Sequence, residues 1–258
     1  MGPSSEKPES YTAELVVLAG YIFFFCLAVI LYFIFLISFT RNLQKSPSQI
    51  NSFATNLPPQ TPIPSIPLNY EPGSLPIFRE DFDNNQNGWT GDPDLASREF
   101  KDGKLYLESL DENSYALTSC SKCPILREPY IFTVELSTDQ LTDGGFGVVF
   151  SLQYTRDYFY LFRINLESKK YFLSRYYEDN WSRRMTGIAD QIQPYPAVNK
   201  LSIYVNKSMV EFYINGKLID TYQDAGTSFQ SGQVGLYVND TGFRLIADNL
   251  IIDKIEGK

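Results

Sequence analysis

The hydrophobic positions of this chain follow two patterns, one long apolar run near its start and short alternating runs beyond residue 76. No charged side chain occurs in the 26 residues 15–40, which Glu14 and Arg41 bracket. At about 1.5 Å per residue such a helix measures roughly 39 Å, enough to cross a hydrocarbon core of about 30 Å. The run therefore predicts one transmembrane helix over residues 15–40, after a short tail at residues 1–14.

A cleaved signal peptide is the rival interpretation of the apolar run. It requires about 7 to 15 apolar residues, a basic flank and a cleavage site of small residues. Here the run is longer, the flank holds Lys7 against three glutamates, and the exit reads Ser38-Phe39-Thr40. We therefore expect an uncleaved, single-pass anchor in the lipid bilayer of the cell membrane.

The flanks of the expected helix give opposing signals for its orientation. Lys7 precedes it whereas Arg41 and Lys45 follow it, which by the positive-inside rule favours a cytoplasmic C-terminus. The proline-rich spacer, the aromatic β domain and the close cysteine pair are typical of exported chains. We predict that the C-terminal domain is extracytoplasmic.

Residues 41–75 form a proline-rich linker. Residues 46–76 contain eight prolines in 31 positions and hardly any charge. Proline breaks helices and sheet ladders and favours extended polyproline geometry, so we expect a semi-rigid stalk. A proline-rich docking ligand is the alternative, which the lack of flanking Arg or Lys disfavours.

Beyond residue 76 the hydrophobic period is two, as in the runs 132–136, 201–205 and 210–214. Such alternation over short runs predicts half-buried strands. Turn signals such as Asp102-Gly103 and Asn215-Gly216 separate the runs. We count about eleven strands and no amphipathic helix, which indicates an all-β sandwich of two antiparallel sheets.

Several blocks follow one another through this region: D-F at 81–82, N-G-W at 87–89, F-K-D-G-K-L-Y-L at 100–107, G-F-G-V-V-F at 145–150, Y-F-Y-L-F-R-I at 158–164, the hairpin 201–216, G-Q-V-G-L-Y at 232–237 and A-D-N-L-I-I at 247–252. Their order resembles the concanavalin A-like lectin/glucanase superfamily, in particular its laminin-G-like and keto-disaccharide-hydrolase-like jelly rolls. The resemblance implies a two-sheet antiparallel jelly-roll sandwich over residues 76–258. It specifies function poorly, because this superfamily includes lectins, hydrolases and structural modules.

Composition excludes several kinds of chemistry. The chain has a net charge of -8, of which -7 falls in residues 76–258 with 19 basic and 26 acidic side chains, so nucleic acid is an unsuitable partner. The chain contains no histidine, which excludes Ser-His-Asp and Cys-His nucleophile systems and imidazole metal ligands.

Glycosidases of the resembled superfamily carry two carboxylates on one strand in an E-x-D-x-x-E run, since retaining hydrolysis needs an acid and a nucleophile about 5 Å apart. This chain has no such run. Glu178 and Asp179 are adjacent, so on a strand they would face opposite sides, and their surroundings indicate a hairpin tip. We assign no catalytic residue, and the chain is more typical of a binding module than of an enzyme.

Carbohydrate binding in this superfamily usually uses the concave sheet or the rim loops, where aromatic faces stack on sugars and polar groups bind hydroxyls. The candidate ligand-binding residues are Arg163, Tyr171, Arg175, Trp181 and Arg183. The alternative is that the two aromatic residues cover core edges while the arginines lie on a solvated face.

The resemblance also implies a structural calcium site, because many relatives bind this ion with acidic oxygens of the first and last strands. The matching positions are Glu80 and Asp248. Carboxylate and carbonyl oxygens suit calcium, which needs six to eight of them. Alternatively, Asp248 only caps the final turn.

Cys120 and Cys123 form a C-x-x-C motif. A c-type haem would need a following histidine, and a tetrahedral zinc site would need two more ligands. A disulfide or two free thiols remain, and an external domain favours the disulfide.

These features together predict a membrane-tethered, non-catalytic binding module for glycan or envelope components. One alternative is an accessory subunit of a larger membrane complex, with the anchor packed against partner helices. The other is a glycan-active hydrolase or lyase.

Overall fold

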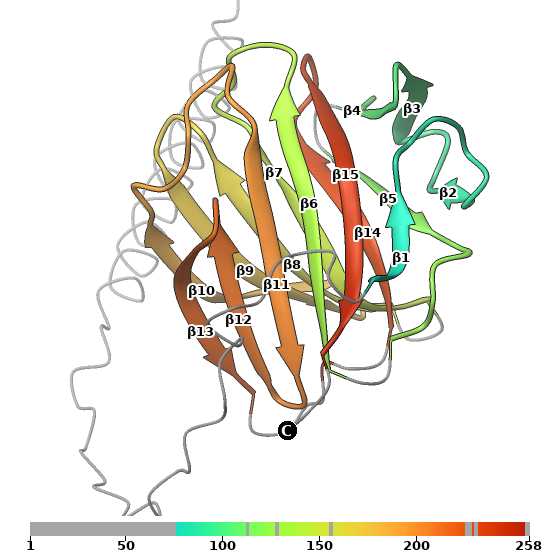
Figure 1. Ribbon diagram of the computed structural model, residues 1–258. Coiled ribbons are helices and arrows are strands. Elements are labelled where there is room, and N and C mark those ends of the chain that lie inside the picture. Colours follow the sequence, from blue (N-terminus) through green and yellow to red (C-terminus); the bar gives the residue numbers. More distant parts are fainter. Residues whose placement is uncertain are drawn as a thin grey trace, which may run out of the picture. The chain divides into compact units, whose positions relative to one another are not determined.

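A computed structural model describes residues 76–111, 114–126, 129–154, 157–224, 229 and 232–255. In these ranges the chain forms two antiparallel sheets, packed face to face (Figure 1). The all-β, two-sheet antiparallel sandwich predicted from the alternation is confirmed. None of the described residues belongs to a helix long and apolar enough to cross a membrane. The helix predicted at 15–40 and the linker at 41–75 lie outside the described residues.

One sheet has eight strands, with β1 beside β15 and the others in the order β13-β12-β11-β6-β15-β4-β3. β15 pairs with β6 on one side, and on the other side with β4 through its first residues and with β1 through its last. Their bounds are β1 (Pro76–Glu80), β3 (Ala96–Lys101), β4 (Lys104–Ser109), β6 (Tyr130–Thr138), β11 (Asn199–Asn206), β12 (Met209–Ile214), β13 (Lys217–Gln223) and β15 (Arg244–Lys254).

The other sheet has seven strands in the order β10-β9-β8-β7-β14-β5-β2. Strands β7 to β10 follow one another in the chain, whereas β14, β5 and β2 come from distant segments. The bounds are β2 (Trp89–Thr90), β5 (Tyr115–Cys120), β7 (Gly145–Gln153), β8 (Tyr158–Asn165), β9 (Lys170–Tyr177), β10 (Asn180–Ile188) and β14 (Gln233–Asn239). One face of this sheet can therefore combine neighbouring and distant parts of the sequence.

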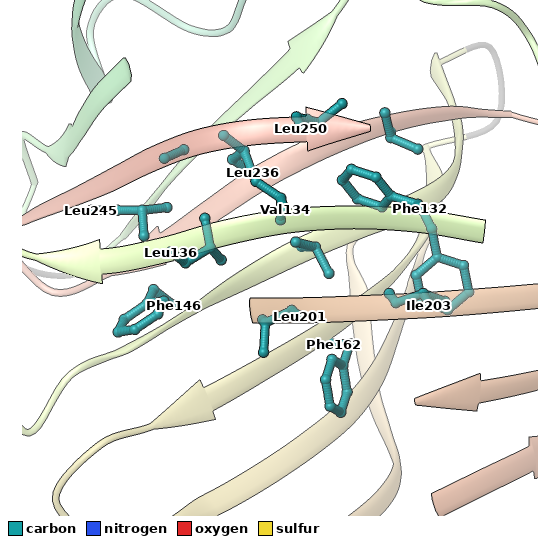
Figure 2. Close-up of a cluster of buried hydrophobic side chains, with 14 of the residues drawn as sticks. Phe132, Val134, Leu136, Phe146, Phe162, Leu201, Ile203, Leu236, Leu245 and Leu250 are labelled. Atoms are coloured by element: carbon teal, nitrogen blue, oxygen red, sulfur yellow. The ribbon is translucent and has the colours of Figure 1, made fainter. Parts of the chain in front are cut away.

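Alternating apolar side chains from both sheets form the core. Phe132, Val134 and Leu136 of β6 lie between the sheets with side chains of both layers (Figure 2). Opposite them, Phe162 of β8 stacks on Phe212 of β12 with ring centroids 4.6 Å apart. Successive side chains of a strand point to opposite faces, so the period of two places one face of each strand in the core.

The turns follow the expected chemistry. Asn215 and Gly216 have φ values of 52° and 78°, which suit a tight hairpin turn between β12 and β13. The described ranges hold fifteen strands, more than the eleven expected. The difference arises because β2 has only two residues and the edge strands β10 and β13 are largely exposed, so they lack a clear apolar alternation.

Candidate binding groove on the seven-stranded sheet

The outward face of the seven-stranded sheet carries a second apolar cluster. In β8, Tyr160 and Phe162 point into the core, so Phe159, Leu161 and Arg163 point outward. Phe159 and Leu161 are nevertheless 3% and 2% exposed. We call this group the outer aromatic cluster; it comprises Val149, Leu152, Phe159, Leu161 and Tyr237, with Tyr115, Leu117 and Tyr176 packed against them.

Trp181 of the edge strand β10 stands at the margin of the outer aromatic cluster. Its ring centroid lies 5.1 Å from that of Tyr176, 5.5 Å from Phe159, 5.7 Å from Tyr115 and 6.3 Å from Tyr237. Edge contacts of this kind hold an aromatic ring in place. The indole is still 42% exposed, so part of its surface remains open to a ligand.

Two arginines lie beside the cluster on the same face. The guanidinium carbons of Arg163 and Arg183 lie 4.8 Å and 5.2 Å from the ring centroid of Phe172. Gly147 pairs with both Arg163 and Tyr237, so no side chain separates these two residues across the sheet. Arg163 also donates to Oδ1 of Asn239 at 3.4 Å. Cation–π contacts thus hold both guanidinium groups at the groove without neutralising them.

These side chains border an open groove of about 380 Å³, within the range of small-ligand sites. It is lined by Leu161, Arg163, Ser174, Trp181, Arg183 and Tyr237. The lining offers an aromatic face, two guanidinium groups and two hydroxyls, and it contains no carboxylate. Such a surface can stack on a ring and bind several oxygen atoms.

The phenols of the groove stay neutral in the physiological range. Burial raises the pKa of Tyr237 to about 12, although nearby Arg163 opposes the shift. The hydrogen bond that Tyr176 donates to Asp179, together with burial, raises the pKa of Tyr176 to about 12. The charge of the groove lining therefore comes from its arginines.

The structure separates the five predicted ligand-binding residues. Arg163, Trp181 and Arg183 line the groove together. Tyr171 and Arg175 lie two residues before and two residues after the core residue Leu173 of β9. Residues two apart on a strand share a face, so both side chains lie on the inward face, opposite to the groove. They do not line this groove, and Tyr171 instead donates to Oδ2 of Asp220 at 2.8 Å.

Sequence reasoning missed Ser174, Tyr176, Tyr115 and Tyr237. Ser174 and Tyr176 follow Phe172 at alternate positions of β9, so the period of two contained a signal for them. Tyr115 and Tyr237 come from β5 and β14, and no local pattern indicates that these strands lie near β8.

The hydrogen bonds of Glu80 indicate a structural role. Its carboxylate accepts hydrogen bonds from the backbone amide of Phe82 at 2.9 Å and from Asn87 and the Trp89 indole at 2.8 Å each. The carboxylate therefore holds the turn that follows β1. The described residues include no group of three or more acidic or cysteine side chains that could hold a metal ion. Calcium binding by Glu80 and Asp248 stays a prediction.

Cys120 and Cys123 form a disulfide, with their Cα atoms 5.3 Å apart. Both are buried, and Cys120 pairs with Trp89 between β5 and β2. The disulfide thus fixes the chain where it leaves β5.

Comparison with known proteins defines the fold. No protein-family model and no curated protein matches the sequence. Among solved structures, a Bacillus subtilis protein of unknown function with a galectin-like fold is similar at a TM-score of 0.57 and 14% identity, over 72% of this chain and 98% of that one. The Bacillus licheniformis β-glucanase is similar at a TM-score of 0.52 and 10% identity, over 69% and 98%.

A third similar structure comes from work on endo-acting O-glycanases that human gut bacteria express to initiate mucin breakdown, with a TM-score of 0.52 and 13% identity over 70% of this chain and all of that one. These likenesses confirm the concanavalin A-like jelly-roll fold. At such identities they show the fold alone.

Proposed function

We propose that this chain is a membrane-tethered module that binds glycans, or envelope components that contain them, in the groove of the seven-stranded sheet. The observation that carries the proposal is the half-exposed Trp181 ring, held by surrounding aromatic rings beside Arg163 and Arg183. The apolar face of a sugar ring stacks on an indole, and its hydroxyls bind arginine, serine and tyrosine groups.

Binding without cleavage fits the groove better than hydrolysis. Retaining and inverting glycosidases need two carboxyl groups about 5 to 9.5 Å apart. The groove lining contains none. The solved structures of similar fold include one described as a β-glucanase, which supports a saccharide ligand by analogy only.

The membrane tether in this proposal is inferred from the sequence. The apolar run at 15–40 would anchor the chain, and the linker at 41–75 would hold the β domain away from the bilayer outside the cell membrane. The groove would then face glycans of the envelope or the surroundings.

Full-length protein in a detergent without a sugar head group is the material for the test, because a maltoside would compete for the groove. Affinity electrophoresis against a panel of polysaccharides measures binding. Trp181→Ala should weaken binding by about 10- to 100-fold, as loss of a central aromatic contact does. Ile188→Ala is the matched control, because Ile188 lies on the same strand, is 71% exposed and does not line the groove.

Equal binding by Trp181→Ala and the parent chain would contradict the site. Failure of the parent chain to bind any polysaccharide, together with copurification of a stable set of membrane subunits, would favour the accessory-subunit alternative.

A further inference from the structure

The two groove arginines form an unusual pair of charges. The guanidinium carbons of Arg163 and Arg183 both lie near the Phe172 ring, at 4.8 Å and 5.2 Å from its centroid, so they are at most 10.0 Å apart. Two positive charges at this separation repel each other, and the repulsion grows as a ligand displaces water. An anion between them would remove it.

No described carboxylate forms an ion pair with either guanidinium group. Arg163 donates to the Asn239 amide oxygen, and its hydrogen bond to the Tyr237 hydroxyl acts to lower the pKa of that phenol, whereas its buried Nε atom has no hydrogen-bond partner. By contrast, Arg244 on the other sheet contacts Asp139 at 2.7 Å and Glu99 at 3.5 Å. The domain has 26 acidic residues, yet none of the described carboxylates forms an ion pair with Arg163 or Arg183. Both guanidinium groups are therefore available to a ligand.

The two ends of the groove also differ in charge. Burial and the nearby charges of Asp179 and Asp157 raise the pKa of Tyr115, although its hydrogen bond with Tyr176 opposes the shift. The hydrogen bond to Asp179, burial and the charges of the same two carboxylates raise the pKa of Tyr176. Tyr176 is four residues along β9 from Phe172, which is about 13 Å. The acidic side chains therefore adjoin the Tyr176 end, and the two arginines mark the Phe172 end.

We propose, on the basis of the glycan-binding function above, that the ligand is an acidic saccharide whose carboxylate or sulfate group binds between Arg163 and Arg183 while a sugar ring stacks on Trp181. Guanidinium groups bind such oxyanions through paired N–H donors. The asymmetry of charge sets the direction of the sugar chain, with the anionic group at the Phe172 end. The net negative charge of the domain acts at longer range and is screened beyond about 10 Å at 0.1 M salt.

The test uses two pairs of polymers that differ in charge. Polygalacturonate is compared with its methyl ester, and dextran sulfate with dextran, against the full-length chain in the same detergent. The parent chain should bind one acidic polymer at least tenfold more tightly than its neutral counterpart. The double variant R163Q/R183Q should lose this preference.

R244Q is the control for loss of an arginine charge away from the groove, since it removes one of the two charges that the double variant removes and lies on the eight-stranded sheet. It should keep the preference. Thermal unfolding of each variant checks folding, and the comparison of acidic with neutral polymers on the parent chain needs no variant at all.

The outcomes separate the inference from the function beneath it. A preference for polygalacturonate assigns a carboxylate, and a preference for dextran sulfate assigns a sulfate. Equal binding of charged and neutral polymers, weakened by Trp181→Ala but not by R163Q/R183Q, overturns the acidic ligand and leaves glycan binding standing. A preference that R244Q abolishes as fully as R163Q/R183Q also overturns it. Binding of none of the four polymers overturns the acidic ligand, and the wider polysaccharide panel then decides the proposed function.

Discussion

The two faces of strands β8 and β9 carry similar residues in different settings. On the inward face, Tyr160 donates to Asp224 at 2.9 Å and Tyr171 donates to Asp220 at 2.8 Å. On the outward face, Arg163 has no such acidic partner. Residue type alone therefore does not mark a site. A polar group that pairs with a carboxylate inside the protein holds the sandwich, whereas a guanidinium group without a described acidic partner can serve a ligand.

The inward tyrosines join the two sheets. Tyr171 belongs to the seven-stranded sheet and Asp220 to β13 of the eight-stranded sheet. Burial, followed by the hydrogen bond to Asp220, raises the pKa of Tyr171 to about 12, so the phenol stays a donor. Burial likewise raises the pKa of Tyr160.

The largest expected effect comes from removing an inward ring. Tyr171→Ala should lower the free energy of unfolding by about 3 to 5 kcal/mol, because a buried aromatic side chain and a cross-sheet hydrogen bond are lost. Glycan affinity per folded molecule should not change. The matched variant Tyr176→Ala, on the outward side of the same strand, should cost about 1 to 2 kcal/mol and weaken binding. Urea unfolding followed by tryptophan fluorescence measures both losses in the free energy of unfolding. A larger loss for Tyr176→Ala than for Tyr171→Ala would contradict the assignment of the two faces.

Gly147 tests whether every outward position is dispensable for folding. A Cβ atom there would lie 2.1 Å from the carbonyl oxygen of Phe162 and 2.6 Å from Cα of Arg163. Gly147→Ala should therefore shift β8 against β7, cost about 2 to 3 kcal/mol and weaken binding. Gly242→Ala has open space around its Cβ but a positive φ, so it should cost about 1 kcal/mol. Equal losses for the two variants in urea unfolding would show that the clash is relieved.

Tyr160→Phe removes only the inward hydroxyl. We expect a loss of about 1 to 2 kcal/mol, because a hydrogen bond to a carboxylate is removed while the ring remains. Tyr237→Phe on the outward face should cost less than about 0.5 kcal/mol and instead reduce glycan affinity. Thermal unfolding and affinity electrophoresis on the two variants give the result, and a larger stability loss for Tyr237→Phe would contradict the assignment.

The smallest effect concerns an exposed pair. Burial tends to raise the pKa of Asp139, but hydrogen bonds from the Arg244 amide and guanidinium lower it overall. A carboxyl whose pKa is lower in the folded state stabilises the fold above its unfolded pKa of about 3.9, and the gain disappears as pH falls through the folded value. Asp139→Asn should therefore cost about 0.5 kcal/mol at pH 7 and almost nothing near pH 2. Urea unfolding at both pH values measures this, and an equal cost at both would exclude the ion pair as the cause.

Alternation along the sequence was sufficient to predict the sandwich, and turn signals predicted the hairpin tip at Glu178-Asp179. Arg163, Trp181 and Arg183 could be named as candidates from residue type, and they share the groove because β8 to β10 are consecutive strands of one sheet. Tyr115 and Tyr237 could not be predicted in this way, since their positions depend on the strand order β7-β14-β5, which joins distant parts of the chain.

Alternation also did not predict the bulge in β10. The register between β10 and β9 shifts between Arg183 and Met185, so simple counting loses the phase of the strand there. The sequence names Tyr171 and Arg175 as ligand-binding candidates by residue type, which does not tell on which face of the sheet each side chain lies. Their inward side becomes clear only once Leu173 is placed in the core.

The pairing of β1 with β15 has a mechanical consequence. Tension applied to the chain before Pro76, while a ligand holds the other sheet, would pull along β1 against its antiparallel neighbour. The hydrogen bonds of an antiparallel ladder lie perpendicular to the strands, so this load would shear all of them together instead of unzipping them one at a time. A tether at this end of the domain would therefore load β1 in shear.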